Sequence, residues 1–111
     1  MKGGEIMAAI QELEVLLARA TPSVLEAEVV QGKVIPVAEI SRGIGLVYGV
    51  FPYQRRAIGV EGRALTYELT RQPILAVEER GQITPLPYAE DIIGHPLSRR
   101  LAGVLEAVSL R

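Results

Sequence analysis

Apolar residues recur along residues 4–20 with the period of an α-helix. Their spacing of four, three and four residues places them on one stripe of that helix. The stripe consists of Ile6, Ile10, Leu13 and Leu17. Pro22 then ends the helix, because the residue before a proline disfavours helical geometry. Residues 96–108 carry a second such stripe, so the pattern predicts a helix near each end of the chain. The 4-3-4 spacing also allows a helix–helix dimer seam.

Shorter apolar runs between these two helices have the composition of β-strands. They are rich in Val, Ile, Leu and Tyr and are bounded by glycine-containing turns. We expect strands at 24–30, 33–40, 44–51, 63–70, 73–79 and 82–87. The pattern therefore predicts one α+β domain over residues 1–111. Helices at both ends accompany one mostly antiparallel sheet of five to six strands.

Two glycine turns predict hairpins with defined registers. With Gln31-Gly32 as a two-residue loop, the preceding strand places Leu25, Ala27 and Val29 on an apolar face. With Arg80-Gly81 as the loop, Val77 faces Thr84 and Leu75 faces Leu86. Each turn is followed by a strand proline, Pro36 or Pro85. Because proline lacks a ladder donor, each must lie at a sheet edge or a bulge.

The strand at 44–51 follows a turn at Ser41-Arg42-Gly43 and has two unlike faces. Its large residues Ile44, Leu46, Tyr48 and Val50 share one face, and Gly45, Val47, Gly49 and Phe51 share the other. Glycines on one face often mark the close approach of a backbone or a ligand. Gly43 and Gly45 do not form a dinucleotide-binding loop, because no third glycine and no helix follow.

Residues 52–57 are expected to form a loop with a notable polar cluster. Tyr53, Arg55 and Arg56 could stack on bases, grip phosphates or contact an acidic protein, and Arg42 could join them. The plainer alternative is a surface loop whose arginines pair with acidic residues of the same chain, Glu61 or Glu39. The candidate partner surface consists of Arg42, Gly43, Gly45, Tyr53, Arg55 and Arg56.

Leu65, Tyr67 and Leu69 are expected on the inner face of the strand at 63–70. Residues 59–62 are expected to form a turn before that strand, because Gly59 and Gly62 bracket them.

Residues able to carry catalysis are scarce. The only histidine, His95, precedes Pro96, and we expect it to mark the helix start rather than a triad with Asp91, the only Asp. The chain has no Cys, which excludes disulfides, thiolate catalysis and cysteine-type zinc sites. We therefore expect no enzyme activity, no metal and no cofactor.

Charge and composition narrow the partners further. The net charge of −1 argues against nucleic acid and anionic membranes. Arginine outnumbers lysine and asparagine is absent, a composition typical of thermophilic or GC-rich sources. No signal peptide is apparent, and the longest uncharged stretch, 43–54, is too short to span a membrane. We expect a cytoplasmic protein.

The segment Gly32-Lys-Val-Ile-Pro-Val-Ala-Glu-Ile-Ser-Arg-Gly-Ile-Gly45 resembles the signature of the sporulation protein YtfJ family, also called GerW. The later Ile83-Thr-Pro-Leu-Pro87 is similar to a strand end in that family. The resemblance implies a link to spore germination and brings no catalytic residues. The chain departs from the family where it replaces a glycine-rich run with large residues between Tyr48 and Arg56.

These observations lead to two hypotheses of different classes. The first is a non-enzymatic, self-associating interaction protein, expected to form a homodimer and to meet an acidic protein partner. The alternative is a small-ligand-binding or hydrolytic protein that uses the glycine-lined strand 43–49.

Overall fold

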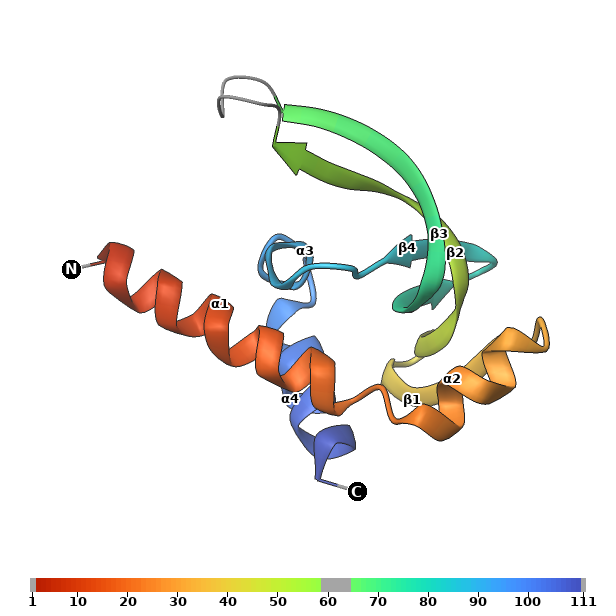
Figure 1. Cartoon of the computed structure of the whole chain (residues 1–111). Coiled ribbons are helices and arrows are strands. Elements are labelled where there is room, and N and C mark those ends of the chain that lie inside the picture. The colour runs from red at the N-terminus through yellow and green to blue at the C-terminus, as the bar shows by residue number, and fades with distance from the viewer. Residues whose placement is uncertain (1, 59–64, 111) are drawn as a thin grey trace.

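In the computed structural model, which describes residues 2–58 and 65–110, helices pack on one open antiparallel sheet (Figure 1). The described helices are α1 (Lys2–Arg19), α2 (Ser23–Val30), α3 (Ala89–Ile93) and α4 (Ser98–Ser109). The described strands are β1 (Ile35–Ser41), β2 (Ile44–Ile58), β3 (Leu65–Glu79) and β4 (Gln82–Pro85), in the order β1-β2-β3-β4. The predicted α+β class and both terminal helices are confirmed. The predicted turn at 59–62 lies outside the described residues.

The first predicted hairpin is wrong, because residues 23–30 form helix α2 rather than a strand. Leu25 and Val29 lie four residues apart, and in the helix both turn toward the core while Ala27 is exposed. Gly32 still has the positive φ of 84° that its turn position required. It lies just beyond the end of the helix, where its N–H donates to the carbonyl of Val29 at 2.8 Å. The glycine was correctly expected to be left-handed, but it ends a helix instead of turning a hairpin.

The other predicted turns are confirmed. Ser41 pairs with Ile44 across Gly43, whose φ is 78°, and this turn joins β1 to β2. Arg80 and Gly81 have φ of 51° and 82°, the two positive values of the tight hairpin turn that joins β3 to β4. Val77 pairs with Thr84, as predicted.

The two strand prolines lie at sheet edges, as predicted. Pro36 belongs to edge strand β1, where the register shifts between Pro36 and Ala38, and Pro85 ends edge strand β4. The two turn segments are not related hairpins, since one follows a helix and the other joins two strands.

The described residues form four strands instead of the expected five to six, because 24–30 belongs to helix α2 and β3 merges two expected strands; β2 and β3 are each 15 residues long. The expected loop at 52–57 is part of β2, and the two strands expected at 63–70 and 73–79 are one strand. Pro52 and Pro73 lie inside these two long strands. Both fit the ladder because neither β1 nor β4 extends alongside this part of the sheet, so no neighbouring strand needs their missing N–H.

The main core lies between the helices and one face of the sheet. Leu46 and Tyr48 of β2 and Leu75 and Val77 of β3 pack there against residues of all four described helices. The helical contributors include Leu13, Val29, Ile92, Leu101 and Leu105. The two-face pattern predicted for residues 44–51 is confirmed, since Val47 and Phe51 pack with Ala76 in a separate small cluster.

Candidate functional site

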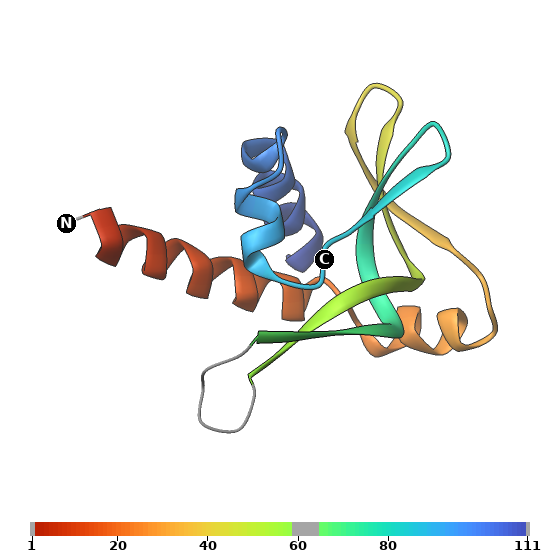
Figure 2. The ribbon, with the colours of Figure 1, turned by 90° about the horizontal axis from the view of Figure 1, so that it is seen from above.

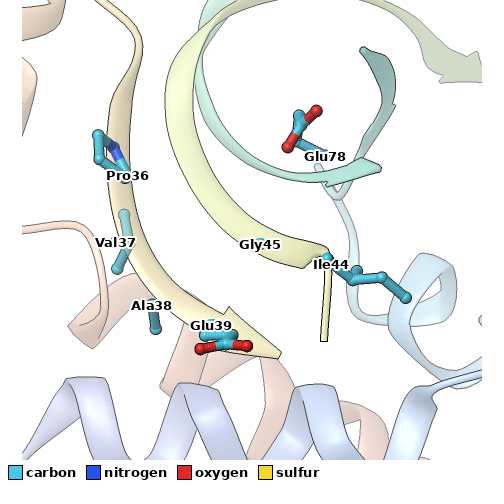
Figure 3. Close-up of a pocket in the computed structure, with 8 residues that line it drawn as sticks. Pro36, Val37, Ala38, Glu39, Ile44, Gly45 and Glu78 are labelled. Atoms are coloured by element: carbon cyan, nitrogen blue, oxygen red, sulfur yellow. The ribbon is translucent and has the colours of Figure 1, made fainter. Parts of the chain in front are cut away.

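A shallow depression on the β1–β2 hairpin contains the glycines that the sequence singled out. Its volume is about 530 Å³, and Figure 3 shows it between the two strands. The lining residues are Pro36, Val37, Ala38, Glu39, Gly43, Ile44, Gly45 and Glu78. Gly45 pairs with Glu39 on one side and with Glu78 on the other, so the two carboxylates flank it at one level of the sheet. This arrangement favours a cationic group over an anionic one.

The two glycines of this strand face have different neighbours. A Cβ at Gly45 would meet only the carbonyl oxygen of Ala38, at an ordinary 3.7 Å. A Cβ at Gly49 would lie 2.9 Å from the ring of Phe51. The close approach expected at the glycine face therefore exists at Gly49, where the chain's own phenylalanine fills the space. Gly45 alone of the two borders the depression.

The depression offers little chemistry beyond its two carboxylates. Glu78 already accepts a hydrogen bond from the N–H of Gly81 at 2.8 Å through its Oε1, which fixes the β3–β4 turn. The lining residues contribute no hydroxyl, amine or imidazole. Within residues 2–58 and 65–110, no three His, Cys, Asp or Glu side chains gather as metal ligands would. The geometry supports binding of a small cation better than hydrolysis.

The expected partner surface is divided between two distant parts of the sheet. Arg42, Gly43 and Gly45 lie at the β1–β2 turn, whereas Tyr53 and Arg55 lie near the far end of β2. Gly45 and Tyr53 are eight positions apart in β2, which corresponds to roughly 26 Å along the strand. Arg55 is exposed and faces Glu68 on β3, a cross-strand pair of opposite charge. Arg56 lies in the same strand and pairs with Tyr67 along the backbone.

Tyr53 is held in place by two contacts rather than free to stack on a ligand. Its hydroxyl donates to Oε1 of Gln72 at 3.0 Å, and its ring meets that of Tyr88 edge-on, with centroids 6.4 Å apart. Burial raises the pKa of Tyr53 and neighbouring Tyr88 adds to the rise, while Arg55 opposes it. Tyr53 thus ties the outer part of β2 to the start of α3.

His95 and Asp91 serve the local backbone. Nδ1 of His95 accepts a hydrogen bond from the N–H of Leu97 at 3.0 Å, just before α4. Oδ2 of Asp91 accepts one from the N–H of Tyr88 at 3.0 Å, at the start of α3. His95 was expected to mark the helix start, and it lies three residues before α4 begins at Ser98.

The most distinctive feature, missed from the sequence, is a pair of projections with uncovered apolar side chains. The first is the α1 overhang, residues 4–10, in which Ile6 is 54% and Met7 57% exposed. The second is the arm, residues 50–58 of β2 with 65–73 of β3. These two segments pair only with each other among the described strands. Figures 1 and 2 show the N-terminal part of α1 extending to the left of the molecule, and Figure 1 shows the arm above α3.

The arm carries apolar residues on the face that is buried elsewhere in the sheet. By strand alternation, Val50 and Leu69 continue the face of Leu46, Tyr48 and Leu75. Val50 is nevertheless 42% and Leu69 71% exposed. The prediction that Leu69 faces inward is therefore wrong, because the described helices do not extend over this part of the strand. Leu65 and Tyr67, which shared that prediction, have side chains outside the described part.

The chain as a whole has more accessible surface than its mass requires. Its accessible surface is 7797 Å², against about 6,000 Å² for a compact monomer of this size. Its radius of gyration is 14.6 Å, against about 13 Å for a compact domain of this length. The surplus of roughly 1,800 Å² exceeds the roughly 800 Å² that each partner buries in a typical stable interface. A surplus of this size over the whole chain is compatible with a surface that a second copy covers.

No helix in the described part of the chain has the length and apolar character needed to cross a membrane. Comparisons with family models, curated proteins and solved structures found no match. The resemblance to the YtfJ family therefore stays a prediction.

Proposed function

We propose that this chain is a non-enzymatic, self-associating interaction domain of the YtfJ (GerW) type, and that it acts as a cytoplasmic homodimer. The observation that carries the proposal is the apolar stripe of α1, which continues beyond the body of the molecule. Leu13 is buried against the other helices, whereas Ile6, on the same stripe two turns earlier, is largely exposed. A stripe that is half covered within the chain calls for a partner to cover the rest.

The arginine-bearing arm is the surface that we assign to an acidic protein partner. Arg55 is exposed there, on the face of the arm opposite to Leu69, and Tyr53 fixes the strand that carries Arg55. The net charge of −1 argues against nucleic acid as that partner. Arg42 lies too far along the sheet to join the same contact.

Binding of a small cation at the depression beside Gly45 is the second candidate. The flanking carboxylates of Glu39 and Glu78 favour it. The two candidates are separable, because the depression lies on the β1–β2 hairpin and the overhang lies on α1. A change at Ile6 therefore tests self-association without altering the depression.

The experiment is sedimentation velocity on Ile6→Glu with Ala8→Glu as the matched control. Ile6 lies on the apolar stripe, whereas Ala8 is exposed on the opposite side of the same helix. Ile6→Glu is expected to weaken dimerisation by about tenfold or more, since it replaces buried apolar area with a charge. Ala8→Glu is expected to leave it unchanged. Equal effects from both changes, or none from either, would contradict the proposal.

A further inference from the structure

We infer that the β2–β3 arm clasps a second copy of this chain, with its uncovered face seated on that copy's α1 overhang. The inference rests on the proposed self-association and names the surface that meets α1. It commits to a two-fold dimer, in which each arm covers the other copy's helix.

The face of the arm that carries Val50 and Leu69 is left uncovered by its own chain in the described structure. A two-stranded ribbon is marginal by itself in water, and stable ribbons pack an apolar face on another element. Val50 and Leu69 lie on one face of the ribbon, four ladder positions apart with Pro52 and Arg71 between them, and neither belongs to the core clusters of the described residues. Figure 1 shows the described end of the arm well separated from α1 of the same chain. The chain's own helix therefore does not cover that end of the arm.

The sheet edges are poorly suited to pairing with another copy. Edge strand β1 has two register shifts and contains Pro36, and edge strand β4 has only four residues and ends at Pro85. The arm itself carries Pro52 on one strand and Pro73 on the other. The two prolines lie two positions apart in the ladder, so both occupy the same type of cross-strand pair, the non-hydrogen-bonded type. In such a pair the N–H points away from the partner strand, so each proline removes a donor from an outer edge of the arm. Edges of this kind oppose strand addition, which leaves face-to-face packing as the available mode.

The two projections match in position, shape and charge. In Figure 1 α1 and β2 both extend toward the left, with the arm above and the helix below, so a two-fold axis could place each arm on the other copy's α1. Arg71 shares the arm face of Leu69, and Glu14 lies a heptad after Met7 on α1. Opposite charges therefore accompany the two surfaces, with Arg71 between Val50 and Leu69 on the arm and Glu14 beyond the overhang on α1. The surplus surface of roughly 1,800 Å² is enough for the interface.

The test uses the absence of cysteine, which makes any introduced thiol unique. One full-length variant carries Ile6→Cys and another, with a mass tag, carries Leu69→Cys. The two are mixed, allowed to exchange and oxidised briefly, and the mixed disulfide is quantified on a non-reducing gel. The matched controls are Ala8→Cys with Leu69→Cys, and Ile6→Cys with Glu68→Cys. Ala8 and Glu68 are exposed neighbours on the opposite sides of the same elements.

The mixed disulfide between the Ile6→Cys and Leu69→Cys variants is expected to form in about tenfold higher yield than the disulfide of either control pair. The reason is that a disulfide requires close Cα atoms and aligned Cβ vectors. If the dominant product were instead a disulfide between two copies of the Ile6→Cys variant, the arm proposal would be overturned. Self-association would still stand, since the α1 helices of the two copies would then pair with each other. Equal yields from all pairs, in a protein that light scattering shows to be a dimer, would overturn it as well. Background yields together with a monomeric mass would remove the proposed function itself.

Discussion

The base of the sheet and the arm share the same two strands but have opposite surroundings. At the base, Leu46 and Leu75 face helices and are almost completely buried. Farther along, Val50 and Leu69 continue the same face and are open to solvent. The strands are continuous across the two regions, so the contrast arises from where the helices end. A face built like a core and left uncovered is typical of a surface that another chain covers.

The largest effect that this contrast predicts is on stability. Leu101→Ala in α4, which contributes to the core at the base of the sheet, removes a fully buried side chain and should cost about 2 to 5 kcal/mol of unfolding free energy. Leu69→Ala in the arm should cost less than about 0.5 kcal/mol in dilute, monomeric protein. Urea titrations at low and high protein concentration measure both. Because Leu69 is assigned to the dimer contact, its cost should grow with concentration, while that of Leu101 should not. Equal costs in dilute protein would remove the distinction between base and arm.

A pair of glycine substitutions sharpens the comparison within β2. Gly49→Ala pushes a methyl group against the ring of Phe51, which is packed in the small cluster, and should destabilise the fold by about 1 to 3 kcal/mol. Gly45→Ala meets nothing closer than 3.7 Å and should be neutral or slightly stabilising. Thermal unfolding of the two variants is the measurement. A destabilised Gly45→Ala with an unaffected Gly49→Ala would contradict the packing described for this face.

The smallest effect on stability is expected from the arm's arginines. The double change Arg55→Ala with Arg56→Ala should shift the unfolding free energy by less than about 0.5 kcal/mol, as exposed charge changes usually do. It should weaken binding of an acidic partner, and added salt should weaken the parent's binding in the same direction. Binding assays against an acidic protein at two salt concentrations measure this. Full retention of partner affinity would remove the assignment of this surface.

The terminal helices and the second hairpin were predictable because their signals are local and redundant. The stripe from Ile6 to Leu17 fits only a helix, and Arg80-Gly81 adopts the conformation that its tight turn requires. Residues 23–30 were ambiguous, since Leu25 and Val29 share a face both in a strand and in a helix. Gly32 could not decide between them, because a hairpin turn and a helix end both favour positive φ.

The arm could not be predicted from the sequence, because its features depend on the absence of described neighbouring strands beside this part of β2 and β3. In a strand with a neighbour on each side, Pro52 and Pro73 would each interrupt the hydrogen-bond ladder. They are compatible with a two-stranded ladder that has no further described strand at either edge. The sequence did not show that the candidate partner surface is divided, because residues 52–57 were expected to form a loop. A loop at 52–57 could have folded back toward Arg42, whereas a continuous strand carries Tyr53 and Arg55 away from it.

The central claim is that the uncovered faces of α1 and the arm meet a second copy of the chain. The molar mass of the parent protein, measured by light scattering over a wide concentration range, tests it most directly. The account predicts a mass that rises to a plateau at twice the chain mass of 12.0 kDa. A mass that stays at 12.0 kDa up to the highest concentration would contradict it.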